Sequence, residues 1–314
     1  MIFRNTFRLL FSNFSNVWKL LVYYLICIVL TFLVCGALAL PIIEKLNQAN
    51  VFSDFLAIVN NFFNNAPSNT ALNLEGVWEN FLQVINSNPQ FTFNYVFLAI
   101  WLLFVFPFTL DLAQLPMGEV LYGYMTSQTK YSFTGRFIKT LKKSLLYSLV
   151  RFFVLLVFNV GIFTFIFLII KLATMGNILY LMLDIALLAC LLIVIAFKYT
   201  LFSCWMPAIS VFDSNVFVAL GQNFVVAFRK FGSIFSTSIL LVILALVFNL
   251  IFGVFSFTVS FIVTIPITVF VFAIFQMVSF FSSQGMKFYV YPDMVISSKT
   301  FEEQMTIENT KYLL

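Results

Sequence analysis

Five polar residues interrupt long apolar runs, and their side chains are the ones best placed to do chemistry in this chain. They are Arg151, Asn159, Asp184, Asn249 and Gln276. A polar group inside a membrane-spanning segment is costly, so it marks either a functional position or a specific contact between helices. A carboxylate such as Asp184 can carry a proton or coordinate a cation there, or it can be structural. The sequence leaves both interpretations open.

Arg151 also has two interpretations. A guanidinium near the inner membrane surface can hold a lipid phosphate, and a long cationic side chain can equally extend to the interface from an apolar stem. The three amides, Asn159, Asn249 and Gln276, favour interhelical hydrogen bonds over a ligand site. Arg151 and Asp184 are expected toward opposite faces of the membrane, so no pairing between them is predicted.

Enzyme motifs are missing from the sequence. It contains no histidine, which is the commonest general base and metal ligand. The four cysteines include no CxxC pair and are best interpreted as small hydrophobes. Asp111 and Glu119 stand eight residues apart and could share a surface, but nothing else completes an active site there. We therefore expect no enzyme activity, no metal and no cofactor.

Membrane-spanning helices must position these residues. Hydrophobic residues make up 62% of the 314 residues and charged residues 9%, against roughly 25% charged in soluble domains. The mean hydropathy is +1.04. Several apolar runs reach the roughly 20 residues that a transmembrane helix needs, whereas a β-barrel would show alternating segments of about ten residues. The predicted fold class is all-α, a polytopic membrane protein.

Six spans are predicted in a single transmembrane domain over residues 1–291. They cover about residues 20–40, 93–112, 145–170, 178–197, 234–254 and 257–281. The last two share one apolar run that is too long for a single helix and is expected to turn near Gly253–Ser256. Residues 41–92 are an extracytoplasmic insertion of two short amphipathic helices. Residues 292–314 are a polar tail, with a capping-box spacing from Thr300 to Glu303.

A basic amphipathic stretch precedes three of the apolar segments. Met1–Trp18, Phe133–Leu145 and Phe217–Phe235 each repeat apolar residues, mostly phenylalanine, every three or four positions and carry cations. They predict three pseudo-repeats, each an interfacial helix followed by a transmembrane hairpin, although any linker before a span can be basic and half apolar. The six cations that we assign to lipid headgroups are Arg136, Lys139, Lys142, Lys143, Arg229 and Lys230.

Positive charge is concentrated on one side of the predicted spans. With the N-terminus inside, every lysine and arginine except Lys45, Lys171 and Arg151 falls on the cytoplasmic side. Both termini are therefore predicted to be cytoplasmic. Topology accounts for the net charge of +5, so no nucleic-acid partner is expected. The first apolar run is longer than the core of a signal peptide, and cleavage is not expected.

One segment resembles a known group of membrane proteins. Trp205-Met206-Pro207-Ala208 is followed by Ala219-Leu220-Gly221-Gln222-Asn223 and then by Phe231-Gly232. This order resembles poorly characterised bacterial six-helix membrane families, among them the membrane domain fused to some glycerophosphodiester phosphodiesterases. In those families an aromatic-Pro-Ala segment leads to an A-L-x-x-S helix, and here Asn223 stands in place of the serine. The resemblance implies a bacterial plasma-membrane protein acting on or near lipids. The phosphodiesterase domain has no counterpart here, so its activity is not expected.

Two functions are compatible with these features. The first is a lipid-associated or transport-associated accessory protein, whose partners are membrane lipids and either another membrane protein or a second copy of the chain. The second is a small transporter or lipid translocator with Asp184 in its path. A transporter predicts a continuous polar path from Asp184 to one of the amides, whereas an accessory protein predicts that these residues are packed singly.

Overall fold

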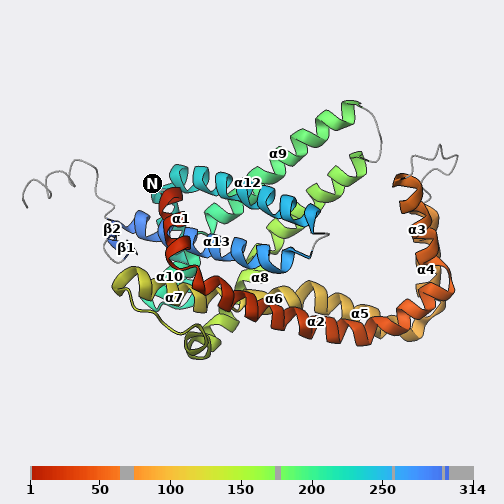
Figure 1. The fold of residues 1–314 in the computed structure, drawn as a ribbon, viewed down its shortest axis with the longest axis horizontal. Helices are drawn as coiled ribbons and strands as arrows, with labels where there is room; N and C mark the ends of the chain where they lie inside the picture. The colour runs from red at the N-terminus through yellow and green to blue at the C-terminus, as the bar shows by residue number, and fades with distance from the viewer. Residues whose placement is uncertain (1, 64–73, 174–177, 257–258, 292–293, 297–314) are drawn as a thin grey trace, which may run out of the picture. The chain divides into compact units, whose positions relative to one another are not determined.

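The computed structural model describes residues 2–63, 74–173, 178–256, 259–291 and 294–296, although the side chains of some residues within these ranges, Asp184 among them, lie outside the description. The chain divides into two compact units (Figure 1). Unit 1 comprises Met1–Leu25 and Leu110–Leu314, and unit 2 comprises Ile26–Thr109. Six helices among the described residues are long and apolar enough to cross a membrane. The chain is therefore an all-α polytopic membrane protein, as the sequence predicts.

Unit 1 holds most of the helices. It contains α1 (Ile2–Ser12), the start of α2 (Ser15–Gln48), the end of α6 (Phe106–Asp111), α7 (Gln114–Ser127), α8 (Phe133–Ala173), α9 (Ile178–Leu201), α10 (Trp205–Phe212), α11 (Val216–Arg229), α12 (Phe231–Phe255) and α13 (Phe261–Gln284). An antiparallel hairpin follows, made of β1 (Phe288–Tyr291) and β2 (Met294–Ile296), with Phe288 opposite Ile296. This hairpin was not predicted from the sequence, because its strands, of four and three residues, are too short to show a clear alternation.

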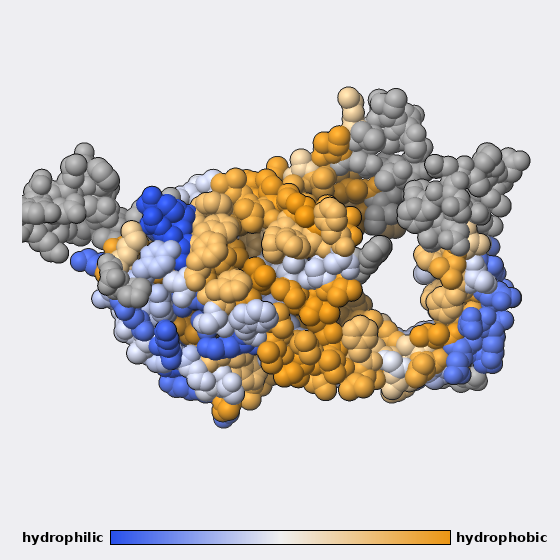
Figure 2. All heavy atoms as spheres, viewed as in Figure 1, coloured by the Kyte–Doolittle hydropathy of each residue, from blue (hydrophilic) through white to orange (hydrophobic). Residues whose placement is uncertain are grey.

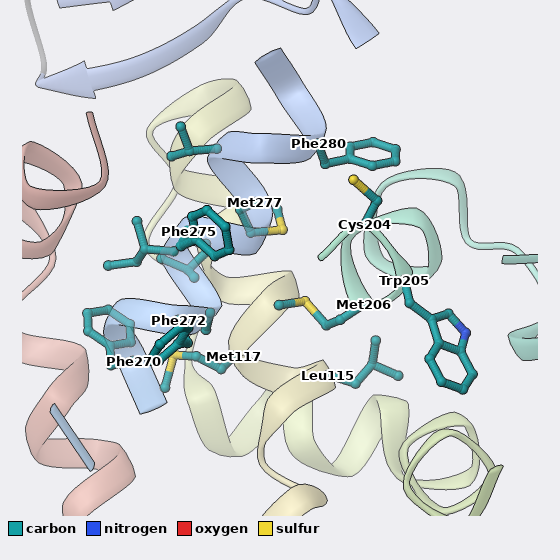
Figure 3. Packing of buried hydrophobic residues seen from close by; sticks show 14 of the residues in the cluster. Leu115, Met117, Cys204, Trp205, Met206, Phe270, Phe272, Phe275, Met277 and Phe280 are labelled. Carbon is teal, nitrogen blue, oxygen red and sulfur yellow. The ribbon is translucent and has the colours of Figure 1, made fainter. Parts of the chain in front are cut away.

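The core of unit 1 is built around α13. This helix packs against α1, α7, α10, α11 and α12 (Figure 1). Of its apolar span 61% is buried, whereas the corresponding share in the other five long helices is 6–22%. Figure 3 shows Phe272, Phe275 and Met277 of α13 in one cluster with Met117 of α7 and Met206 of α10. The other long helices leave most of their apolar side chains exposed, as helices that face lipid do.

Helices α7 and α10 contact each other closely. A Cβ added at Gly118 in α7 would overlap Met206 Sδ and lie 2.8 Å from Ser210 Oγ, both in α10. Each helix has a proline at its third position, and each ends at a residue with left-handed backbone: Gln128 has φ 57° and Asp213 has φ 51°. The two helices therefore share a starting pattern, an ending pattern and a common contact surface.

The residues of the Trp205–Asn223 segment fold against one another. The Asn223 side chain accepts a hydrogen bond from the Cys204 backbone N–H at 2.9 Å and donates one to the Leu201 carbonyl at 2.7 Å. The indole of Trp205 donates to the Val216 carbonyl at 3.0 Å. Asn223 thus satisfies backbone groups that the break between α9 and α10 leaves without helical partners.

Helix α11 turns its small residues inward and its aromatic residues outward. Ala219 and Ala227 are buried together with Asn223, whereas Phe217 and Phe228 are exposed. Small side chains allow close approach to neighbouring helices, and an exposed aromatic face suits contact with an apolar environment. The aromatic stripe found in the sequence therefore faces away from the core of unit 1.

Helix α8 differs from its sequence-based prediction. The basic stretch Phe133–Leu145 and the span predicted over residues 145–170 form one continuous helix of 41 residues. No proline interrupts this stretch, so nothing in the backbone separates the basic part from the apolar part. At 1.5 Å per residue the helix is about 61 Å long, roughly twice the thickness of the hydrocarbon core of a membrane.

Unit 2 contains the rest of α2, α3 (Val51–Phe63), α4 (Leu74–Ser87), the 3₁₀ turn η1 (Pro89–Phe91), α5 (Thr92–Ile100), the π-helical turn η2 (Trp101–Val105) and the start of α6. The two amphipathic helices predicted in the insertion are present as α3 and α4. Ile42, Leu46 and Val51 form the small core of this unit. The residues between these two helices, 64–73, lie outside the described residues, as does the capping-box spacing from Thr300 to Glu303.

The surface of unit 1 is divided by polarity. Figure 2 shows hydrophilic residues gathered on the end that holds α1 and the β1–β2 hairpin, whereas hydrophobic residues cover α12. Large exposed apolar side chains on α12 include Leu240, Val247 and Phe255. This division is the one expected where part of a helical bundle lies in lipid and another part lies in water.

Candidate functional site

Four cations predicted to contact lipid headgroups line one pocket in unit 1. The pocket has a volume of about 690 Å³ and lies among α7, the first turns of α8 and the end of α10. We call it the basic pocket, and its charged residues are Arg136, Lys139, Lys142, Lys143, Glu119 and Asp213. Four cations and two carboxylates leave a net charge of +2. The pocket is therefore electrostatically suited to an anion.

Helix periodicity brings the cations together. Residues three, four and seven positions apart lie on one face of an α-helix, which places Arg136, Lys139 and Lys143 along the same side of α8. Tyr131, just before the helix, packs against α7 where Gly123 leaves room, because a Cβ at Gly123 would overlap the tyrosine ring. The Arg136 guanidinium lies over that ring, 3.6 Å from its centroid, in a cation–π arrangement.

Two of the four cations are held by carboxylates. Arg136 Nη1 lies 3.0 Å from Glu119 Oε2, and both side chains are mostly buried. Lys143 Nζ donates to the Asp213 carboxylate and, at 3.0 Å, to the Asp213 backbone carbonyl. The hydrogen bond and charge of Lys143, together with the more distant charge of Lys139, lower the pKa of the exposed Asp213 carboxyl. These contacts tie the start of α8 to α7 and to the end of α10.

The other two cations have no such partner. Lys139 and Lys142 form no ion pair with any residue that the structure describes, and both side chains are exposed. Two apolar side chains also line the pocket: Ile138, which is 71% exposed, and Leu141. The pocket therefore offers unpaired ammonium groups beside apolar surface, a combination that fits a molecule with an anionic head and an apolar tail.

No protein-family model, curated protein or solved structure matches this chain. Its function is therefore inferred from the geometry of its own residues.

Arg229 and Lys230 lie apart from the basic pocket, although the sequence grouped them with its cations. Arg229 Nη1 donates to Gln284 Oε1 at 3.0 Å, and Lys230 Nζ donates to Ser282 Oγ at 3.4 Å. Both bonds join the α11–α12 junction to the end of α13. Their charges are available at the surface, but the structure does not place them with the other four.

Arg151 forms an ion pair that sequence analysis missed. Its Nη1 lies 2.9 Å from Asp111 Oδ1, and only 12% of the Arg151 side chain is exposed. Gln114 donates to the same carboxylate oxygen at 2.8 Å, and the Tyr147 ring lies beneath the guanidinium. The two interpretations weighed for Arg151, a lipid phosphate or extension to the interface, did not include this partner. Asp111 stood at the end of another predicted span, 40 residues away.

Two of the three amides make the interhelical bonds that the sequence predicts. Asn159 Oδ1 accepts from Lys198 Nζ at 2.6 Å, which links α8 to α9. Asn249 Nδ2 donates to Thr268 Oγ1 at 3.0 Å, which links α12 to α13. Gln276 differs, because its buried Oε1 has no hydrogen-bond partner among the described residues. Asp184 lies in α9 with its side chain outside the description, so its proposed role with a proton or cation stays a prediction.

Proposed function

We propose that this chain is a non-catalytic, lipid-associated accessory protein of a bacterial plasma membrane, and that its basic pocket holds the phosphate of an anionic lipid. The observation that carries this proposal is the position of Lys139 and Lys142, unpaired among the described residues and lying beside exposed apolar side chains. Arg136 and Lys143 keep the wall of the pocket in place through their carboxylate partners. A membrane-protein partner or a second copy of the chain would bind elsewhere on the apolar surface.

The length of α8 supports a pocket at headgroup level. Only about 20 of its 41 residues are needed to cross the hydrocarbon core, so its charged first turns lie beyond the apolar region while its later turns cross it. The excess of lysine and arginine on this side favours the cytoplasmic leaflet, with both termini cytoplasmic. That leaflet is rich in anionic lipids, which attract cations near its surface.

Pseudo-repeats are part of the same proposal. Helices α7 and α10 share a proline at the third position and a left-handed final residue, and each is followed by a basic amphipathic stretch. The hydrogen bonds of Trp205 and Asn223 give a structural reason for the sequence pattern that resembles the membrane domain fused to glycerophosphodiester phosphodiesterases. A distant relationship to those six-helix families is consistent with these features.

The test compares lipid binding by matched charge variants. Full-length wild type, Lys139→Gln/Lys142→Gln and Lys45→Gln/Lys287→Gln are purified in mild detergent, and bound phosphatidylglycerol and phosphatidylcholine are measured by native mass spectrometry. The control pair removes the same charge from exposed sites outside the pocket. Each lysine near an anionic surface contributes about 1 kcal/mol, so we expect at least a tenfold loss of phosphatidylglycerol in the pocket variant alone. Equal loss in both variants, or no preference for phosphatidylglycerol in wild type, would reject the proposal.

A lipid translocator or small transporter is the second candidate, and the partly buried Asp111–Arg151 pair favours it. The Asn159–Lys198 and Asn249–Thr268 hydrogen bonds favour the accessory protein instead, because each packs a polar residue in a separate contact and not along one continuous path. Reconstituted vesicles with a fluorescent lipid distinguish the two functions. Protein-dependent loss of inner-leaflet fluorescence after addition of a membrane-impermeant quencher would support translocation, and protection equal to that of protein-free vesicles would reject it.

A further inference from the structure

A small cavity lies inside unit 1, beside the Asp111–Arg151 pair. Its volume is about 40 Å³, and residues of α2, α7, α8, α9 and α13 contribute to its lining. Four of the lining side chains carry polar groups: Gln114, Arg151, Tyr199 and Gln276. This cavity is separate from the basic pocket, with which it shares no residue.

Some polar groups around the cavity have no hydrogen-bond partner among the described residues. An arginine carries five N–H donors, and Arg151 uses one of them on Asp111. Gln276 also lines the cavity; it is 6% exposed, and its buried Oε1 accepts no hydrogen bond from the described residues. The cavity thus has spare donors on α8 and a spare acceptor on α13. Buried polar groups in native proteins are nearly always satisfied by protein or by ordered water.

We propose that this cavity is a water-binding site, in which water accepts from the Arg151 guanidinium and donates to Gln276 Oε1. The volume is sufficient, since a water needs roughly 10–15 Å³ of such space and two to four polar partners. An anion suits the site less well, because the Asp111 carboxylate already neutralises Arg151 and the spare group on Gln276 is an acceptor. An apolar ligand would leave both polar groups unsatisfied. Water both accepts and donates, and it fits the small volume.

This site goes beyond the proposed lipid function. It solvates the Asp111–Arg151 ion pair, and it links α8 and α13 through water. Other buried hydroxyls lie along α13, among them Ser279 and Ser283, but neither of them lines this cavity.

Radiolytic footprinting tests the proposal, because X-ray pulses convert bound water into hydroxyl radicals that oxidise adjacent side chains. Met117 lines the cavity and is 1% exposed, whereas Met277 is 0% exposed and does not line it. With the full-length protein in lipid nanodiscs, we expect Met117 to be oxidised several-fold faster than Met277. Equal, slow oxidation of the two methionines would show a dry cavity and overturn the proposal.

Substitution of the acceptor provides the second comparison. Gln276→Leu removes the polar group from α13, and we expect Met117 oxidation to fall toward the Met277 rate. Asn249→Leu is the matched control, because it removes an amide that does not line the cavity, and it should leave the ratio unchanged. An unchanged ratio in Gln276→Leu would overturn the assignment of Gln276. Should that variant fail to fold, the wild-type comparison still decides whether the cavity holds water.

Discussion

Arg151 Nη1 lies 2.9 Å from Asp111 Oδ1, so an ion pair joins α8 to the last residue of α6. Both partners belong to helices that are apolar enough to span a membrane. Breaking a buried pair by removing one partner leaves an uncompensated charge, which is more costly than removing both.

We expect Arg151→Met to lower the free energy of unfolding by about 3 kcal/mol, near the lower end of the range for buried pairs because Asp111 is partly exposed. Arg151→Met/Asp111→Asn should recover part of that loss. Thermal unfolding in detergent, with Lys45→Gln as the control, measures both effects. A double variant less stable than Arg151→Met would contradict the prediction.

The tight contact of Gly118 with α10 predicts a strong response to one methyl group. Gly118→Ala should destabilise unit 1 by about 1–3 kcal/mol, since Met206 is buried and must move. Gly221→Ala in α11 is the control, because its added Cβ meets nothing within 4 Å, and it should stabilise by about 0.5–1 kcal/mol. Similar unfolding temperatures for the two variants would refute the close contact.

Asn223 satisfies the Cys204 N–H and the Leu201 carbonyl through its side chain. Asn223→Ala should cost about 2 kcal/mol, at about 1 kcal/mol for each of the two hydrogen bonds. Neighbouring Gln222→Ala makes a suitable control, because Gln222 Oε1 has no partner among the described residues. Chemical denaturation followed by tryptophan fluorescence would measure both effects, and an equal effect of the two substitutions would contradict a stabilising role for the Asn223 hydrogen bonds.

The pair between Lys143 and Asp213 predicts a pH dependence. Because the pKa of Asp213 is lowered in the folded state, its stabilising effect is present above the unfolded carboxyl pKa of about 3.9 and is lost as pH falls through the folded value. Asp213→Asn should therefore be slightly less stable at pH 7, by at most about 1 kcal/mol for an exposed pair. The difference from wild type should shrink below pH ~4 in thermal unfolding. A stability difference that grows toward low pH would contradict the prediction.

The sequence predicts the number of spans because membrane-crossing helices need long apolar runs that local composition reveals. The amphipathic helices α3 and α4 were also predictable, since their 3.6-residue periodicity is strong. The boundaries of the spans were harder to predict. Helix α8 begins 12 residues before its predicted span, because a basic stretch without proline can continue a helix as readily as precede it.

Pairings between distant residues were not predictable from local patterns. Asp111 and Glu119 attracted attention together because they are close in sequence, yet each pairs with a different arginine on α8. A single arginine in one apolar helix and a single aspartate at the end of another would have suggested the Asp111–Arg151 pair. The four cations of the basic pocket share a short stretch, so their grouping was predictable, whereas Asp213 came from 70 residues away.

The continuity of α8 has a mechanical consequence. Lys143 and Arg151 stand eight residues apart on a helix with no proline, which places them about 12 Å apart along one stiff rod. Without a hinge between them, a tilt or rotation that draws Lys143 toward the membrane surface also displaces Arg151 from Asp111. The basic pocket and the Asp111–Arg151 pair are therefore mechanically coupled through α8.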